Sequence, residues 1–385
     1  MKVAIVHDYL HQYGGAEKVV EKWLEMYPEA DIYTSIYTPN KFKSSELITR
    51  AGQENRIYTS FAQLFIPKII RFFKHFFWLY PIAMSLVKVR NYDLVLISST
   101  YCGKNVQIQN CGKIIHYCHS PVRFLYGLIT ETDHKTINPI LRHGIPLFTF
   151  WLRWMDMKAA QYLLKKGCIW VANSNYIKGV VKRIYGIDAI TIYPPAEIQK
   201  YLGVERNPDH QEPFYFFMGR ITFHKKVDMV IQACLELGRK VLISGAFSFD
   251  GDRLVFEKII SDYVSQHPEA DGLVKFLGRV PDEDLHRYLS KCQAYIFPGR
   301  EDFGIAQIEM LAAGIPLVEY GAGGALEYSI EGINSIMFEK QNLDSLKDAI
   351  LRFEQKKDWD YKQIKETARP FASEVFVQKI SEIVA

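Results

Sequence analysis

Short apolar runs alternate with helix-forming stretches along almost the whole chain of 385 residues. The runs are rich in Val, Ile, Tyr and Phe, which favour buried strands. Parallel strands need a crossover between them, usually a helix, so the alternation indicates an α/β protein with doubly wound parallel sheets. The expected strands are Lys2–Tyr9, Asp31–Ile36, Arg56–Ser60, Leu94–Ser99, Lys113–His119, Ile169–Ser174, Ile190–Tyr193, Phe214–Met218, Lys240–Ser244, Val274–Leu277, Ala294–Phe297, Ile315–Tyr320 and Ser335–Phe338.

Two prolines interrupt this alternation near the middle of the chain. Tyr193-Pro194-Pro195-Ala196 ends one strand, because proline has no backbone N–H to offer a sheet, and the polar stretch Glu205–Glu212 follows. A chain of this length is also long enough to form two domains of ordinary size. We therefore expect domains over residues 1–195 and 196–370, followed by a last helix in residues 371–385.

Charge is divided unevenly between the two halves. Residues 1–200 contain 25 Lys and Arg against 14 Asp and Glu, or +11, whereas residues 201–385 contain 22 against 29, or −7. The 48% of hydrophobic residues is enough to bury cores, which excludes a disordered chain. We expect the basic half to meet an anionic partner, for which nucleic acid and an anionic membrane surface are both candidates.

The six cysteines form no Cys-x-x-Cys pair, which favours reduced thiols in a cytosolic protein. They lie at positions 102, 111, 118, 168, 234 and 292. Met1-Lys2 leads directly into an expected strand without the apolar stretch of a secretion signal, so we expect a protein that is not secreted.

The segment Phe61–Arg90 combines bulky aromatic side chains with positive charge and contains no acidic residue. It is too short and too charged to span a bilayer. A helix lying in the lipid headgroup region and a core or interdomain helix with inward aromatics are both compatible with it. Ile140–Trp154 is a second aromatic stretch that could join it at a membrane. The basic residues of the first segment are Lys68, Arg71, Lys74, Lys88 and Arg90.

Two glutamates eight positions apart lie in an expected strand–helix–strand unit over residues 294–320. Glu301 precedes the helix, and Glu309 lies two turns into it among apolar residues. A carboxylate there is costly without a partner, so we expect one from outside the helix; an incidental polar residue is the alternative. Backbone amides at the helix start would suit an oxygen-rich ligand. They belong to Phe303, Gly304 and Ile305.

Further candidate residues follow expected parallel strands, whose carboxyl ends meet at one edge of a sheet. Gly14 and Gly15 open the first helix, where backbone amides can approach an anion. His119 precedes Ser-Pro in a loop, a position that a plain turn residue also occupies. Arg220 and Lys225 bring two positive charges to the second sheet, which suits a diphosphate.

No acidic pair near these residues is spaced for a metal ion, so we expect none. We interpret Asp250-Gly251-Asp252 as a turn. The chain also lacks the Gly-x-Ser-x-Gly, His-Glu-x-x-His and Gly-Lys-Ser/Thr motifs, which argues against hydrolase, zinc-protease and P-loop chemistry.

Several motifs stand together in the order and spacing of one enzyme family. They are Gly219-Arg220 with Lys225–Asp228, Lys275–Val280, Glu301-x7-Glu309 with its Phe-Gly and Ala-Gly-Ile-Pro, and Gly321–Glu327. They resemble the retaining glycosyltransferases of the GT-B fold in the family numbered four. The resemblance implies two Rossmann-like domains facing a cleft, with a last helix that crosses back onto the first domain. Tyr117–Arg123 is similar to the subgroup that builds bacterial surface polysaccharides such as O-antigen, often with mannose.

The resemblance also implies roles for the candidate residues. Arg220 and Lys225 would neutralise the donor diphosphate, and Glu301 and His119 would hold the sugar. Glu309 would bind the ribose hydroxyls. The other donor-binding residues would be Gly14, Gly15, Arg279, Val280, Phe303, Gly304, Ile305, Gly323 and Gly324. Weaker candidates for contact with an acceptor or a membrane, for which a solvated charge is the alternative, are Lys104, Arg123, Lys68, Arg71 and Lys74.

The implied function is transfer of a sugar from a nucleotide-sugar, GDP-mannose by the subgroup resemblance, in α-linkage to a polyprenyl diphosphate-linked glycan. Such a mannosyltransferase would be a peripheral protein of the inner, cytosolic membrane face, with neither a cofactor nor a nucleic-acid partner. A UDP-linked hexose or N-acetylhexosamine is the alternative donor. An inactive, membrane-docked scaffold is the alternative function.

Overall fold

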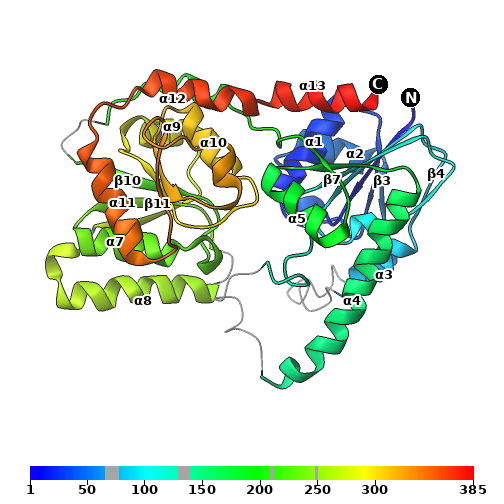
Figure 1. Ribbon diagram of the computed structural model, residues 1–385, viewed down its shortest axis with the longest axis horizontal. Coiled ribbons are helices and arrows are strands. Elements are labelled where there is room, and N and C mark those ends of the chain that lie inside the picture. The colour runs from blue at the N-terminus through cyan, green and yellow to red at the C-terminus, as the bar shows by residue number, and fades with distance from the viewer. Residues whose placement is uncertain (66–77, 129–138, 209–211, 248–249) are drawn as a thin grey trace. The chain divides into compact units, whose positions relative to one another are not determined.

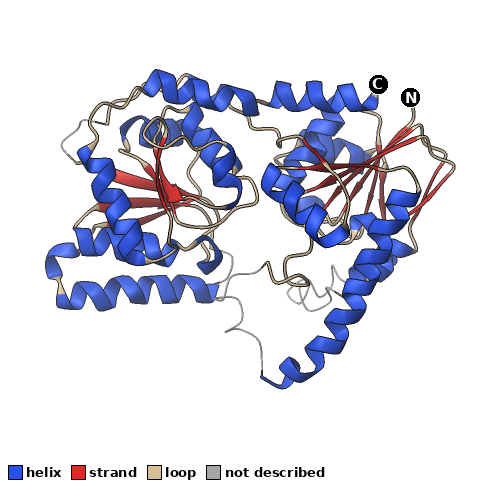
Figure 2. Cartoon of the chain, in the orientation of Figure 1, coloured by secondary structure: helices blue, strands red, loops and turns tan. Residues whose placement is uncertain are grey.

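The computed structural model describes residues 1–65, 78–128, 139–208, 212–247 and 250–385. The described chain divides into two compact units, Met1–Pro195 with Glu374–Ala385, and Ala196–Ser373. Each unit has a main parallel sheet with helices packed against it (Figure 1; Figure 2). The fold is therefore the expected α/β fold with two doubly wound sheets.

The first unit is built on a sheet with the order β3-β2-β1-β5-β7-β8-β9, in which every pairing is parallel. The order reverses between β1 and β5, and ligands of open α/β sheets bind at such a point. The strands are β1 (Val3–His7), β2 (Asp31–Thr34), β3 (Ile57–Thr59), β5 (Leu94–Ser99), β7 (Lys113–Cys118), β8 (Ile169–Ala172) and β9 (Ile190–Thr191); β4 (Lys88–Arg90) and β6 (Gln107–Gln109) form a separate parallel pair.

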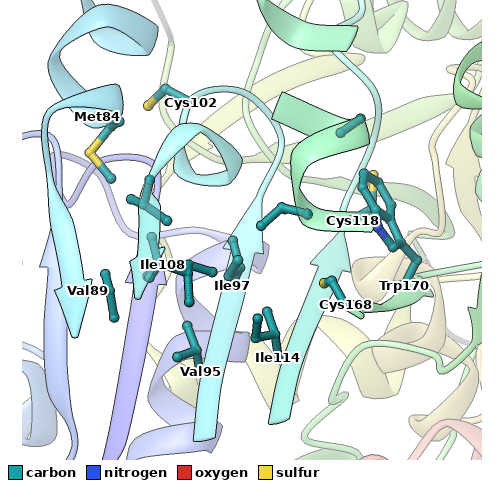
Figure 3. Close-up of a cluster of buried hydrophobic side chains, with 14 of the residues drawn as sticks. Met84, Val89, Val95, Ile97, Cys102, Ile108, Ile114, Cys118, Cys168 and Trp170 are labelled. Carbon is teal, nitrogen blue, oxygen red and sulfur yellow. The ribbon is translucent and has the colours of Figure 1, made fainter. Parts of the chain in front are cut away.

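Alternate residues of this sheet enter two different cores. Val3 and Ile5 pack with helices of one face, and Ala4 and Val6 with helices of the other. The first face is covered by α1 (Gly15–Met26), α2 (Glu46–Gln53) and α13 (Ser373–Val384), and the second by α3 (Leu79–Ser85), α4 (Pro139–Lys165) and α5 (Asn175–Tyr185). Figure 3 shows part of the second core, including Val95, Ile97, Ile114 and Trp170.

The second unit has a parallel sheet with the order β12-β11-β10-β13-β14-β15. Its strands are β10 (Phe214–Met218), β11 (Lys240–Ser244), β12 (Val274–Gly278), β13 (Tyr295–Phe297), β14 (Leu317–Tyr320) and β15 (Ser335–Phe338). Its helices are α6 (Gln199–Leu202), α7 (Val227–Leu237), α8 (Asp250–Gln266), α9 (Asp282–Lys291), α10 (Ile305–Ala312), α11 (Leu343–Gln355) and α12 (Tyr361–Ala368). Phe216 stacks on Tyr288 of α9, while its neighbour Tyr215 meets Phe353 of α11, so both faces of this sheet are covered.

Local sequence signals set the ends of several helices. At the start of α5, the Ser174 hydroxyl accepts a hydrogen bond from the Ile177 N–H. Gly186 ends the same helix in the left-handed conformation, as does Gly238 for α7.

All thirteen expected strands are present, with each end within two residues of the prediction. The pair β4 and β6 was not predicted. The described parts of the aromatic segment Phe61–Arg90 are not one helix, because they form the 3-10 turn η2 (Phe61–Leu64), α3 and β4. Phe65 is exposed, whereas Tyr80 is buried in the core. The described part of the segment therefore contributes aromatic side chains both to the surface and to the core.

Asp250–Asp252 is not the predicted turn, because it begins α8. Among the helices that are described, none is long and apolar enough to cross a membrane.

Candidate active site

A lysine and a glutamate form an ion pair at the carboxyl edge of the second sheet. Lys225 ends the 3-10 turn η6 (Phe223–Lys225) after β10, and Glu301 lies in the loop after the neighbouring strand β13. The Lys225 Nζ is 3.0 Å from the Glu301 Oε1, and the two side chains are 17% and 21% exposed. The same Nζ lies 5.5 Å from the centre of the Phe297 ring. Both charges are therefore held in place yet remain open to solvent.

A glycine turn, η8 (Gly323–Glu327), packs directly against the Glu301 loop. The Gly324 N–H donates to the Glu301 carbonyl at 2.9 Å. A Cβ on Gly324 would lie 2.4 Å from the Phe303 backbone, and one on Gly323 would lie 2.5 Å from the Glu301 carbonyl oxygen. Only glycine permits this approach. The predicted residues Glu301, Phe303, Gly323 and Gly324 are thus brought together.

Helix α10 begins beside this turn, with Gly304 as its N-cap at φ +110°. A Cβ on Gly304 would lie 2.6 Å from the Tyr328 hydroxyl oxygen. The buried Phe303 ring packs edge to face on Tyr328, with the ring centres 5.9 Å apart. Glu309 is 5% exposed and accepts a hydrogen bond from Tyr201 of α6, which lies outside its own helix. Burial, and then the charge of Glu309, raise the pKa of Tyr201.

A second carboxyl group is buried close to Tyr328. Glu319, on β14, is 1% exposed and accepts hydrogen bonds from the Ser329 hydroxyl and, at 3.4 Å, the Tyr328 hydroxyl. Burial raises the pKa of Glu319 to about 8, against the smaller opposing effect of these two hydrogen bonds. Because Tyr328 also packs on Phe303, Glu319 supports the loop that carries Glu301.

Three other predicted residues, Arg220, Arg279 and Val280, follow β10 and β12 at the same edge. Both arginines are exposed, and neither forms an ion pair with the described part of the chain. Three glycines at the ends of β10, β11 and β12 have positive φ, namely Gly219, Gly245 and Gly278. Gly245 donates its N–H to the Gly278 carbonyl at 2.8 Å, and a Cβ on Gly245 would lie 1.7 Å from the Gly219 carbonyl oxygen. A side chain at Gly245 would therefore collide with the backbone of the neighbouring strand end, so glycine is required there.

In the first unit, His119 follows β7 next to the ends of β1 and β5. Its Nε2 is 2.8 Å from the Ser98 Oγ, which is itself 3.1 Å from the His7 Nδ1. The His7 Nε2 is 3.4 Å from the Glu17 Oε1. Burial, and then the charge of His7, lower the pKa of His119 to about 3. His119 is therefore neutral at ordinary pH.

Gly14 and Gly15 lie beside this group at the start of α1. Gly14 is extended, and a Cβ on it would lie 3.3 Å from the Glu17 Oε2. The Glu17 carboxylate is 3% exposed and lies in the first helical turn, where negative charge is favoured. The predicted anion-binding turn is thus followed by a buried acid, Glu17, which is paired with His7.

Asp8 organises the loop that follows β5. Its donors are the Ser99 hydroxyl at 2.8 Å and the N–H groups of Thr100 at 2.7 Å, Tyr101 at 2.9 Å and Gly103 at 2.6 Å. Burial would raise the pKa of Asp8, but the charge of His7 and these hydrogen bonds outweigh it and lower the pKa. Asp8 therefore remains ionised and keeps this loop closed over the strand ends.

The prediction that Lys104 contacts a ligand or stands in solvent is wrong. Its side chain is 2% exposed, and its Nζ lies 2.7 Å from the Asp156 Oδ1. Asp156 also accepts hydrogen bonds from Tyr126 and Tyr185. A buried lysine needs such an acid, so Lys104 joins α4 to the 3-10 turn η4 (Gly103–Asn105). Of the other weak candidates, Arg123 is half-buried, and Lys68, Arg71 and Lys74 lie outside the described residues.

Sequence reasoning missed several residues at or near the two strand edges. They are His7, Asp8, Glu17, Ser98, Gly245 and Glu319. His7 and Asp8 carried a signal, since they are polar residues at the end of an apolar strand, and so did Glu319 within an expected strand. Across the described residues, no group of three or more His, Cys, Asp or Glu could hold a metal ion.

Most of the second unit is similar to a known protein family. Residues 204–371 match the family of group 1 glycosyl transferases. An uncharacterised glycosyltransferase of Methanocaldococcus jannaschii is 29% identical over 46% of this chain and 47% of its own length. A phosphatidyl-myo-inositol mannosyltransferase of Propionibacterium freudenreichii is 36% identical over 37% of this chain and 35% of its own length.

A GDP-mannose-dependent α-(1-6)-phosphatidylinositol monomannoside mannosyltransferase of Mycolicibacterium smegmatis is 24% identical over 43% of this chain and 44% of its own length. The chain therefore matches less than half the length of these curated relatives. Among solved structures, HepE of Anabaena in complex with UDP is similar over 100% of this chain and 99% of its own, with a TM-score of 0.66 and 17% identity.

The similarity to HepE extends over both units and concerns the fold alone. The family match is narrower, but it contains Lys225, Glu301, Glu309 and the glycine turn. The chain thus has the two-domain GT-B fold, and its residues 204–371 match the family of group 1 glycosyl transferases.

Proposed function

We propose that the protein is a retaining glycosyltransferase that moves mannose from GDP-mannose, in α-linkage, to a lipid-linked glycan of a bacterial surface polysaccharide. The observation that carries the proposal is the Lys225–Glu301 pair beside the glycine turn, within the family match. A cation and the backbone amides of a helix start, next to an acid, suit a diphosphate joined to a sugar. Two relatives are named as mannosyltransferases, one of them GDP-mannose-dependent, which favours this donor.

In the proposed reaction, the bond between the sugar C1 and the donor diphosphate breaks while the acceptor oxygen bonds to C1 on the same face. The acceptor proton passes to an oxygen of the departing diphosphate. Arg220 and Lys225 stabilise the charge that builds on that group. Glu301 and the amides of Phe303, Gly304 and Ile305 hold the sugar hydroxyls, and Glu309 holds the ribose.

In the first unit, His119 would orient the sugar, and Gly14 and Gly15 would contact the donor. In the second unit, Arg279 and Val280 would contact the base. No metal or cofactor is part of this mechanism. The acceptor is a polyprenyl diphosphate-linked glycan, reached from the cytosolic face of a membrane.

A UDP-sugar is the second candidate donor. The solved structure of HepE, which shares the fold over the whole chain, contains UDP. The exposed Arg279 and the neighbouring strand-end glycines offer mainly backbone groups to a base, and backbone groups suit either uracil or guanine.

The test is the thermal stabilisation of the purified protein by a panel of nucleoside diphosphates and their sugars. A ligand that binds only the folded state raises the melting temperature. We expect GDP and GDP-mannose to stabilise the wild type, and Lys225→Ala to weaken their binding by roughly tenfold or more, since it removes a charged hydrogen-bond donor. Lys362→Ala, which removes an exposed lysine of the same unit, is the matched control and should bind normally.

The panel separates the alternatives directly. Stabilisation by UDP species alone would replace GDP-mannose with the second donor. A wild type that responds to no nucleotide would contradict the transferase proposal and leave an inactive scaffold as the explanation of the fold.

A further inference from the structure

Three buried side chains form a continuous hydrogen-bonded row that ends at His119. Glu17 contacts His7, His7 contacts Ser98, and Ser98 contacts His119, at 3.4, 3.1 and 2.8 Å. Glu17, His7 and Ser98 are 3%, 2% and 0% exposed. They come from α1, β1 and β5, so only the folded sheet brings them together.

The neighbours of His7 determine its protonation. Its Nε2 faces the Glu17 carboxylate, and its Nδ1 faces the Ser98 carbonyl oxygen at 3.1 Å. Both partners are acceptors, so both ring nitrogens of His7 carry protons and the ring is positively charged. In agreement, burial lowers the pKa of His7, but the hydrogen bond and charge of Glu17, with smaller effects of Asp8 and Ser98, outweigh it and raise the pKa.

The charged His7 in turn determines the direction of the next hydrogen bond. Its Nδ1–H also lies 3.1 Å from the Ser98 Oγ, so that oxygen accepts from His7. The Ser98 hydroxyl proton is then free to be donated to the His119 Nε2. A neutral His119 that accepts at Nε2 carries its proton on Nδ1.

The Nδ1 of His119 is the open end of the row. It forms no hydrogen bond within the described residues, and it is not among the buried polar atoms that lack a partner. His119 itself is only half-buried. Its Nδ1–H therefore faces outward from the carboxyl edge of the first sheet, where a ligand of such a sheet binds.

We propose that Glu17, His7 and Ser98 are positioning residues that hold His119 as the neutral tautomer with its proton on Nδ1, so that this N–H donates to an oxygen of the sugar substrate. The two parts of the row act differently. Ser98 sets the tautomer, and the Glu17–His7 pair places a positive charge nearby that opposes protonation of His119. The inference rests on the proposed transferase function for the identity of the ligand, but not for the tautomer.

The tautomer can be observed without a substrate. In the protein labelled with 15N-histidine, long-range proton–nitrogen NMR spectra at pH 6 should show His119 protonated at Nδ1 alone and His7 protonated at both nitrogens. The His119→Gln and His7→Gln variants assign the signals. A His119 protonated at Nε2, or a neutral His7, would overturn the inference whatever the activity of the protein.

Variants then test the consequence for transfer. Ser98→Ala should lower kcat roughly tenfold or more, because the His119 ring is no longer held in its orientation. The donor KM should change little, because the contacts to the donor phosphates are kept. Ser98→Thr keeps the hydroxyl and should restore most of the rate. Ser35→Ala is the control, because it removes a buried hydroxyl whose partner is the Asp8 carbonyl, not His119. Melting temperatures identify any variant that fails to fold.

Glu17→Gln tests the charge rather than the tautomer. Without the carboxylate, buried His7 becomes neutral, so the pKa of His119 moves upward towards its ordinary value, although Asp8 remains nearby. We expect the acid limb of the pH–rate profile to shift to higher pH in this variant. An unchanged pH–rate profile would contradict the statement that the Glu17–His7 pair opposes protonation of His119. If wild type transfers no sugar but the NMR tautomers are as stated, the proposed function fails and the positioning row stands.

Discussion

Lys225 and Glu301 neutralise each other in the structure, yet they are proposed to contact different parts of one donor. A diphosphate that reaches Lys225 would compete with the Glu301 carboxylate for the same ammonium group. Partly exposed ion pairs contribute little to stability, so such an exchange of partners costs little. Glu301 would be released towards the sugar as the diphosphate binds.

We therefore expect Glu301→Gln to bind GDP no more weakly than the wild type, and up to about threefold more tightly, because a competing charge is removed. Sugar transfer should fall at the same time. Isothermal titration with GDP and a transfer assay with GDP-mannose measure the two effects. Glu257→Gln, which breaks the exposed Arg253–Glu257 pair on α8, is the control. Weaker GDP binding by Glu301→Gln would mean that Glu301 positions Lys225 instead.

Glu319 predicts a pH dependence of stability. Its carboxyl has a pKa of about 8 in the folded state against an ordinary 4.5, so the folded chain holds a proton that the unfolded chain releases between these values. The stabilising contribution of Glu319 is therefore complete below about pH 4.5 and is lost as the pH rises to about 8. Glu319→Gln should gain in melting temperature relative to the wild type between pH 5 and pH 8. Glu339→Gln, which changes an exposed glutamate, should show no such gain. An equal change in the melting temperatures of both variants would mean that the raised pKa of Glu319 is not the cause.

Residues whose roles depend on distant partners were the hardest to predict from the sequence. Lys104 looked like a solvated loop charge because its partner, Asp156, lies on a helix of a different region. His7 and Ser98 are 91 positions apart and meet only because β1 and β5 are paired. The Glu301, Phe303 and glycine-turn group was easier, since its members come from one strand–helix–strand unit and the turn that directly follows it.

At the scale of elements, α4 presents exposed aromatic side chains in a basic setting. Phe150 is 68% exposed and Trp154 is 53% exposed. The Lys158 Nζ lies 5.8 Å from the centre of the Trp154 ring. Aromatic rings next to lysines suit the headgroup region of an anionic membrane, which agrees with the proposed lipid-linked acceptor.

We expect the wild type to sediment with vesicles containing phosphatidylglycerol, and the double variant Phe150→Ala, Trp154→Ala to bind them roughly tenfold more weakly, because it removes two inserting rings. Leu254→Ala removes a similarly exposed apolar side chain from α8 and serves as the control. A wild type that does not bind these vesicles would exclude α4 as a membrane contact.

The strands were predictable because each is an unbroken apolar run between polar turns. Strands β4 and β6 were not predicted, although β3 and β13 are equally short. Each of β4 and β6 has a single buried residue between charged or amide side chains, so no apolar run marks it. The aromatic segment Phe61–Arg90 was ambiguous for a related reason, since aromatic residues serve a core and a membrane surface equally well.

At the scale of the whole molecule, the first unit is completed by the end of the described chain. Phe376 of α13 is 1% exposed and packs edge to face on Tyr117 of β7, with the ring centres 5.8 Å apart. Phe376→Ala should cost about 3 kcal/mol of stability, because it leaves a cavity in this core. Urea unfolding followed by tryptophan fluorescence measures the loss. Gln378→Ala, on the exposed side of the same helix, should stay within about 0.5 kcal/mol. Equal effects of the two variants would mean that α13 is not part of this core.

The position of α13 also sets an order for synthesis. A chain emerging from the ribosome delivers residues 1–195 first, but the helix that covers Trp23 and Tyr117 arrives only after the whole second unit has been made. Until then, one apolar face of the first sheet lacks its last cover. Nascent chains halted before residue 374 should therefore be the ones that chaperones hold longest, and those halted after it should be released.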